Sequence, residues 1–145
     1  MERVLEIYQP RLIDNDTFRR LNHARDFLAQ NFDQIITLED VADEACFSPF
    51  HFQRQFKRAF QESPHEFLTR LRLEQAQKLL AKSDLTVSEI CLEVGYESLG
   101  SFSTLFARRA GCPPTDFRKI YSIPVHWWLR SVPGCFVSRS SFNPN

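Results

Sequence analysis

The stretch that decides the fold runs from Leu38 to Phe60 and reads LEDVADEACFSPFHFQRQFKRAF. Its apolar residues fall into two sets separated by a short polar interval: Leu38, Val41, Ala42 and Ala45, then Phe52, Phe56 and Phe60. Steps of three and four residues place each set on one face of a helix. The sequence therefore predicts two short helices joined by a tight turn.

A second stretch repeats this pattern and reads VSEICLEVGYESLGSFSTLFARRA from residue 87 to residue 110. Val41 recurs as Ile90, 49 residues later, and Phe52 recurs as Phe102, 50 residues later, because the second turn has one added residue. A short turn between two short helices lets the second helix enter a major groove of DNA. Two copies in register therefore point to DNA.

The segment between the copies is predicted to form a long linker helix from Pro64 to about Lys82. Ser63 is a cap residue, Pro64 suits the first helical position and Glu66 lies in the first turn. At 1.5 Å per residue, roughly 18 residues make a rod of about 27 Å. That length is close to the roughly 34 Å between major-groove segments one turn apart. The rod is expected to hold both recognition helices on one side of a duplex.

The predicted fold is all-α, with about seven helices in two helix-turn-helix subdomains joined by the linker helix. We expect a lead-in over 1–16, the first subdomain with the linker helix over 17–82, the second subdomain over 83–122, and a tail over 123–145. Asp16 and Thr17 are expected to cap the first helix, which should end near Phe32. Trp127 and Trp128 of the tail are interpreted as folding back on the core, with a contact surface for another protein as the alternative.

Length and composition exclude several classes of protein. A chain of 145 residues holds one or two small cores, but not a DNA-binding unit together with a sensor domain of ordinary size. Its hydrophobic content of 43% excludes a disordered chain. No apolar stretch approaches the roughly 20 residues of a membrane span, and the first residues lack a secretory signal. We therefore expect a cytoplasmic protein that does not bind membranes.

Chemistry-bearing residues show no arrangement that indicates catalysis or metal binding. The four cysteines lie far apart without a CxxC pair or zinc-ligand spacing: Cys46, Cys91, Cys112 and Cys135. Cys91 is interpreted as a small buried residue of an apolar helix face. Neither a phosphate-binding glycine loop nor the spacing of a nucleophile and its base is present. We expect no enzyme activity, no metal, no cofactor and no disulfide.

The distribution of charge matters more than its sum. A formal net charge of zero argues against nucleic acid at first, because basic domains bind phosphates by releasing counterions. However, acids crowd the first helix of each pair: Glu39, Asp40, Asp43, Glu44, Glu89 and Glu93. The proposed recognition helices, over 48–60 and 98–111, contain no acid but five basic residues: Arg54, Lys57, Arg58, Arg108 and Arg109. The same separation in both copies favours double-stranded DNA as the partner.

Residues 36 to 122 resemble the DNA-binding domain of the AraC/XylS family of bacterial transcription regulators. The residues that carry the resemblance are Leu38-Glu39-Asp40-Val41-Ala42, Ser48 through Lys57, Gly95-Tyr96-Glu97-Ser98, Phe102, Phe106, Gly111, Pro113 or Pro114, and Phe117-Arg118. In size the chain is similar to the small stress and multidrug-response activators, which bind DNA as monomers and recruit RNA polymerase. The resemblance implies seven helices, with the recognition helices in successive major-groove segments.

The best candidate DNA contacts of the first recognition helix lie on the face opposite its core phenylalanines: Phe50, Gln53, Arg54 and Lys57. His51 and Arg58 of the same helix are further candidates. Arg54 suits a bidentate contact to guanine and Gln53 suits adenine. Phe50 suits a thymine methyl group, with a partly exposed aromatic as the alternative. Lys57 suits a phosphate. His51 is either a backbone contact or idle.

Candidate contacts of the second recognition helix are Gly100, Ser101, Ser103, Thr104 and Arg108. The positions equivalent to Phe50, Gln53, Arg54 and Lys57 carry Gly100, Ser103, Thr104 and Ala107. These residues have little reach, whereas the family commonly has a basic or amide side chain there. We therefore expect the first helix to supply most base discrimination, and the second helix mainly to position the DNA backbone.

Cys46 is another departure from the family pattern. The family usually has glycine at this turn, as Gly95 is in the second copy, because the chain often needs a positive φ there. Cys46 predicts either backbone strain or a shifted turn.

Together these features predict a sequence-specific DNA-binding transcription regulator, an activator that binds asymmetric two-box sites in adjacent major-groove segments. The alternative is an interaction protein that kept the fold, lost sequence-specific binding and acts through a partner. A third interpretation is a DNA-binding portion separated from its sensor domain.

Overall fold

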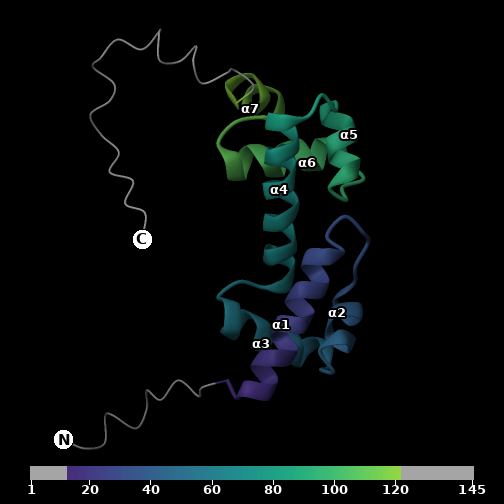
Figure 1. The fold of residues 1–145 in the computed structure, drawn as a ribbon, viewed down its shortest axis with the longest axis vertical. Coiled ribbons are helices and arrows are strands. Elements are labelled where there is room, and N and C mark those ends of the chain that lie inside the picture. Colours follow the sequence, from purple (N-terminus) through teal and green to yellow (C-terminus); the bar gives the residue numbers. More distant parts are fainter. Residues whose placement is uncertain (1–12, 122–145) are drawn as a thin grey trace, which may run out of the picture.

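The computed structural model describes residues 13–121, which form seven helices and no strand (Figure 1). The helices are α1 (Asn15–Gln30), α2 (Leu38–Glu44), α3 (Pro49–Phe60), α4 (Pro64–Lys82), α5 (Val87–Glu93), α6 (Leu99–Ala110) and α7 (Pro114–Tyr121). The predicted all-α fold is confirmed: α2 and α3 form the first helix-turn-helix, α5 and α6 the second, and α4 links them. Most of the predicted lead-in and the tail with Trp127 and Trp128 lie outside the described residues.

Three helices begin with a reciprocal pair of hydrogen bonds between the cap residue and an acid three residues later. The pairs are Thr37 with Asp40 for α2, Ser63 with Glu66 for α4, and Thr86 with Glu89 for α5. Each pair satisfies two backbone N–H groups that the first turn leaves without helical partners. The predicted cap of α4, Ser63, is confirmed.

The start of α1 differs from the prediction. Its cap is Asp14, whose carboxylate accepts a hydrogen bond of 2.9 Å from the backbone N–H of Thr17. Asp16 lies inside the first turn and pairs with Arg19 at 2.6 Å. The prediction of Asp16 and Thr17 as the cap was wrong because an earlier acid has the reach to the third backbone N–H. The helix also ends at Gln30, short of Phe32.

Two hydrophobic cores lie along α4, one in each half of the molecule. The first contains Leu21, Ala24, Leu28, Val41, Ala42, Ala45, Phe52, Phe56 and Phe67. The second contains Leu73, Ala76, Leu80, Ile90, Cys91, Val94, Phe102 and Phe106. In Figure 1, α1, α2 and α3 lie at and below the lower end of α4, and α5, α6 and α7 lie around its upper half. We call these halves the first unit and the second unit.

The sequence repeat extends to the backbone. Cys46 and Gly95, which occupy equivalent turns, both have positive φ, at 53° and 84°. Gln61 and Gly111, which end the two recognition helices, also have positive φ, at 62° and 84°. Cys46 therefore keeps the left-handed conformation of the glycine position, which confirms backbone strain and excludes a shifted turn.

Each unit also has its own scaffold helix, a part of the repeat that the sequence patterning did not reveal. The buried residues of α1 and of the second half of α4 have the same spacing: Leu21, Ala24 and Leu28 against Leu73, Ala76 and Leu80. An arginine directly precedes the first leucine in both helices, Arg20 in α1 and Arg72 in α4. The repeat therefore comprises three helices, not two.

Candidate nucleic-acid interface

The outer face of α3 presents the side chains that the sequence predicts as base contacts. Phe52 and Phe56 are completely buried, whereas Gln53, Arg54 and Phe50 are exposed. Phe50 is 71% exposed, which is unusual for so large an apolar side chain. The guanidinium of Arg54 lies 5.7 Å from the centre of the Phe50 ring. Together the two residues form an apolar and cationic pair that projects from the helix into solvent.

The last turn of α3 carries Lys57 and Arg58, both exposed. Cations at this end of a helix are favourable, because the helix dipole places negative charge there. Among the ion pairs of residues 13–121, none involves Arg54, Lys57 or Arg58. These three positive charges are therefore available for phosphates or base edges.

His51 has an intramolecular partner. Its ring packs against that of Phe47 in the preceding turn, with ring centres 5.1 Å apart. The imidazole is nevertheless exposed. His51 thus packs against the turn that leads into α3, and its exposed ring stays accessible for the predicted DNA contact.

The outer face of α6 has shorter side chains. Gly100, Ser101, Thr104 and Arg108 are exposed, whereas Ser103 is half-buried. The side chain of Ser98 caps the helix by accepting a hydrogen bond of 3.3 Å from the Ser101 backbone N–H. Two arginines, Arg108 and Arg109, occupy its last turn. The helix therefore offers hydroxyl groups along its face and positive charge at its end.

Both recognition helices end in positive charge. Lys57 and Arg58 occupy the last turn of α3, and Arg108 and Arg109 occupy the last turn of α6. The backbone N–H and the hydroxyl of Ser63 lower the pKa of Glu66 in the first turn of α4, and the charges of Lys57 and Arg109 lower it further. The positive ends of both helices therefore favour the charged form of this acid.

Arg20, which sequence reasoning missed, holds the turn before α3. Its guanidinium donates a hydrogen bond of 2.8 Å to the Ala45 carbonyl and another to the Cys46 carbonyl. The same group lies 4.0 Å from the centre of the Phe47 ring. An arginine before a buried leucine in both scaffold helices was the only sequence signal for this role.

Comparison with known proteins places this arrangement in a family. A family model described as a helix-turn-helix domain matches residues 41–120. The transcriptional activator RhaS of Escherichia fergusonii is 36% identical over 106 residues, which cover 73% of this chain and 38% of RhaS. The chain belongs to the AraC/XylS family of transcription regulators. The chain spans well under half the length of RhaS.

Solved AraC/XylS-type domains have the same fold. The C-terminal domain of AraT, a response regulator from Geobacillus stearothermophilus, aligns with a TM-score of 0.68 at 32% identity, over 78% of this chain and 91% of that domain. The DNA-binding domain of the global transcriptional factor AdpA, solved with a target DNA, aligns with a TM-score of 0.68 at 27% identity, over 70% and 92%. The fold of this chain is thus that of an AraC/XylS DNA-binding domain.

No group of three or more histidine, cysteine or acidic side chains between residues 13 and 121 is arranged to hold a metal ion. No helix in the same range is long and apolar enough to cross a membrane.

Proposed function

We propose that the chain binds duplex DNA as a monomer, with α3 and α6 in successive major-groove segments, and recognises an asymmetric site of two boxes. The observation that carries the proposal is the outer face of α3, where exposed Phe50 lies beside Arg54, and where Arg54 and Lys57 take part in no ion pair among residues 13–121. Both recognition helices lack acids and end in positive charge. Because phosphates lie on both sides of each groove, such ends suit contacts to the DNA backbone.

Base discrimination is assigned mainly to α3. Arg54 and Gln53 are exposed and have the reach to pair with guanine and adenine edges. Phe50 offers an exposed ring to a thymine methyl group. The short side chains of Ser101, Thr104 and half-buried Ser103 suit backbone contacts, together with Arg108.

The effect on transcription is proposed from likeness to relatives. RhaS is a transcriptional activator, and AdpA is a transcription factor solved on its target DNA. By analogy we assign this chain to activation, with RNA polymerase as its protein partner.

One observation favours a second function, that of an interaction protein acting through a partner. Gly100 and half-buried Ser103 leave α6 with few groups for base recognition. A chain that relied on α3 alone would have little specificity, because one short helix contacts only a few base pairs.

Selection of bound duplexes from a random DNA pool distinguishes the two functions. We expect an asymmetric motif of two boxes about one helical turn apart, bound by one copy of the chain. A salt titration on the selected duplex then counts the phosphate contacts, and Lys57→Ala should reduce the slope of log affinity against log salt by about one. Lys82→Ala, an exposed lysine in the last turn of α4 and outside both recognition helices, is the control and should leave the slope unchanged. Enrichment of no sequence contradicts the proposed function and favours the partner-dependent protein.

A further inference from the structure

Arg72 connects the two units. It lies on α4 next to Leu73 of the second core, yet its guanidinium donates hydrogen bonds to the loop that follows α1 in the first unit. Nε donates to the Phe32 carbonyl at 2.6 Å and Nη2 donates to the Gln34 carbonyl at 2.8 Å. The planar guanidinium suits such a pair of acceptors, because its donors have a fixed fork geometry.

The same guanidinium contacts the turn that leads into α6. It lies 5.4 Å from the centre of the Tyr96 ring. Partial burial lowers the pKa of Arg72, because desolvation disfavours its charged form. An arginine nevertheless remains protonated at physiological pH. The carbonyls of Phe32 and Gln34 and the ring of Tyr96 stabilise its positive charge.

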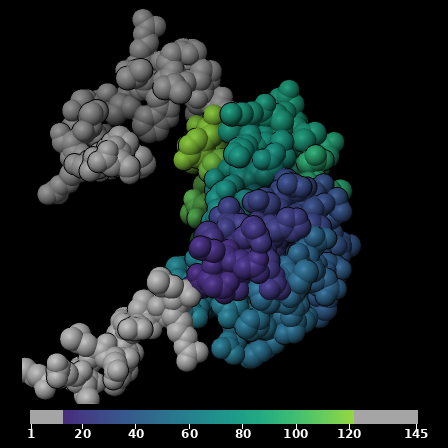
Figure 2. All heavy atoms as spheres, turned by 60° about the horizontal axis from the view of Figure 1, so that its bottom comes forward, coloured from purple at the N-terminus to yellow at the C-terminus, as the bar shows by residue number. Residues whose placement is uncertain are grey.

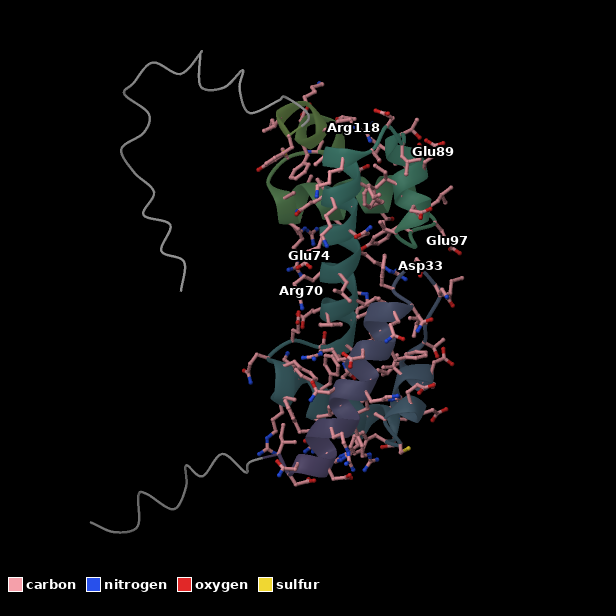
Figure 3. The ribbon with its side chains drawn as sticks, viewed as in Figure 1. Asp33, Arg70, Glu74, Glu89, Glu97 and Arg118 are labelled. Carbon is pink, nitrogen blue, oxygen red and sulfur yellow. The ribbon has the colours of Figure 1, made fainter. Side chains whose placement is uncertain are left out.

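The units also touch directly beside Arg72. A Cβ atom on Gly95 would lie 2.7 Å from the carbonyl oxygen of Asp33, in the loop after α1. In Figure 3, Asp33 and Glu97 lie on the same edge of the molecule at the level where the units meet. The space-filling view shows the purple and blue atoms of the first unit against the teal and green atoms of the second (Figure 2). The turn before α6 is therefore packed against the first unit.

The equivalent arginine of the first unit makes no such connection. Arg20 stacks on Phe47 as Arg72 stacks on Tyr96, but its donors bind the carbonyls of its own turn, Ala45 and Cys46. The second turn has Gly95, which adopts a positive φ without strain and needs no such support. Arg20 thus stabilises a turn within the first unit, whereas Arg72, at the equivalent position, joins the two units.

We propose that Arg72 is a positioning residue that fixes the distance and rotation between α3 and α6, and thereby sets the spacing of the two DNA boxes that the chain accepts. This inference rests on the proposed two-box function. Adding one base pair between the boxes moves the second box by about 3.4 Å and rotates it by roughly 35°. The contacts of Arg72 and Gly95 prevent α6 from making the same shift and rotation relative to α3. Without the Arg72 hydrogen bonds, α4 has more freedom to bend.

The test measures affinity against spacing. Duplexes carry the two selected boxes, with the interval changed by one or two base pairs in either direction. For the wild-type chain we expect one optimal spacing and binding about tenfold weaker one base pair away. For Arg72→Ala we expect a lower affinity at the optimum and a loss of only about threefold at the neighbouring spacings. The base preference within each box should stay the same, because Arg72 lies outside α3 and α6.

Arg20→Ala is the matched control. It removes the same side chain from the equivalent position of a scaffold helix, together with a stacked ring and two carbonyl bonds, but it breaks no bond between units. We expect weaker binding at every spacing with the optimum as sharp as in the wild type. Circular dichroism and thermal unfolding establish that each variant is folded. Should Arg72→Ala not fold, Arg72→Lys carries the test, because lysine keeps the charge but lacks the fork, and intermediate broadening is expected.

The outcomes separate the two proposals. A wild-type chain that binds all spacings equally overturns the two-box function, and the role of Arg72 with it. A sharp optimum that persists in Arg72→Ala, or in Arg72→Lys where the alanine variant is unfolded, overturns the role of Arg72 alone. Broadening by Arg20→Ala to the same extent also overturns it, since spacing would then follow any loss of stability.

Discussion

The guanidinium of Arg20 lies 4.0 Å from the centre of the Phe47 ring, directly behind the turn that aims α3. The turn contains Cys46 with a φ of 53°, a conformation that disfavours any residue with a Cβ by roughly 1–2 kcal/mol. Arg20 donates hydrogen bonds to the carbonyl of Cys46 itself and to that of Ala45, the residue before it. Arg20 and Cys46 are therefore energetically linked.

We predict that Arg20→Ala destabilises the chain by about 1–3 kcal/mol, because hydrogen bonds from a charged group and a stacked ring are lost together. Cys46→Gly should stabilise the wild type by up to about 1 kcal/mol, and should stabilise the Arg20→Ala chain by clearly more, because its strained turn has lost the Arg20 bonds. Unfolding in urea measures all four free energies. Arg19→Ala, an exposed neighbour, is the control and should change stability by less than about 0.5 kcal/mol. Strict additivity of the Arg20 and Cys46 changes would contradict the link.

Gly95 and Gly111 provide a second comparison, because both have a φ of 84° and differ only in their surroundings. A Cβ on Gly111 meets nothing within 4 Å, whereas a Cβ on Gly95 meets the Asp33 carbonyl oxygen at 2.7 Å. Gly111→Ala should therefore cost about 1–2 kcal/mol from backbone conformation alone. Gly95→Ala should cost clearly more, because a contact between two backbone segments has no flexible side chain to move away.

Thermal unfolding of the two variants side by side checks this order. Equal losses of stability would show that the second unit moves away from the first at little cost. That result would also weaken the case for a rigid junction at Arg72.

The local parts of this fold were predictable from the sequence, since their signals are local. Thr37, Ser63 and Thr86 each stand three residues before an acid, and the structure has all three capping pairs. The burial of Phe52 and Phe56, and the exposure of Arg54, follow from helical spacing. The internal repeat strengthened those signals that occur twice, such as Thr37 with Thr86 and Phe52 with Phe102.

The long-range contacts were not predictable. Arg72 binds carbonyls 38 and 40 residues earlier in the chain, and Arg20 binds carbonyls 25 and 26 residues later. An arginine on a helix gives no sign of which distant carbonyls it meets, because only the packed fold brings them together.

The capping acids predict how stability changes with pH. Hydrogen bonds from the Thr86 backbone and hydroxyl lower the pKa of Glu89 below its ordinary value of 4.5, and the hydroxyl and backbone of Thr37 lower the pKa of Asp40 below its ordinary value of 3.8. Because the folded pKa is the lower one, each carboxylate adds stability that is fully present above the unfolded pKa and is lost as the pH falls through the folded pKa. We expect Glu89→Gln to reduce the slope of unfolding free energy against pH below about pH 5.

Urea unfolding at a series of pH values between about 3 and 7 tests this expectation. Glu93→Gln, which removes an exposed carboxylate of the same helix that caps nothing, is the matched control. An identical reduction by both changes would attribute the effect to net charge instead of capping.

The second recognition helix yields a prediction of small effects. Ser103→Ala and Thr104→Ala should leave the selected DNA motif nearly unchanged, because short hydroxyl groups are assigned to the DNA backbone. Selection from the random pool with each variant measures the motif base by base. A change of preferred bases in either variant would assign direct readout to α6.

Arg54 and Lys57 lie about one helical turn apart on α3 but should differ in what they recognise. Arg54 projects beside exposed Phe50, where a bidentate contact to guanine is within its reach. Lys57, in the last turn, suits a phosphate. Arg54→Ala should therefore weaken binding by about 1–3 kcal/mol and relax the preference at one base pair. Lys57→Ala should weaken binding to all sequences alike and reduce the salt slope by about one.

Affinity measurements on the selected duplex and on its single-base variants, each at several salt concentrations, separate these two roles. The decisive quantity is the ratio of affinities for the preferred and altered base, which should fall towards one for Arg54→Ala at a single position and stay constant for Lys57→Ala. If Arg54→Ala instead lowers the affinity for every duplex by the same factor, Arg54 binds the DNA backbone. Base recognition by α3 would then rest on Gln53 and Phe50, two further exposed side chains of this helix.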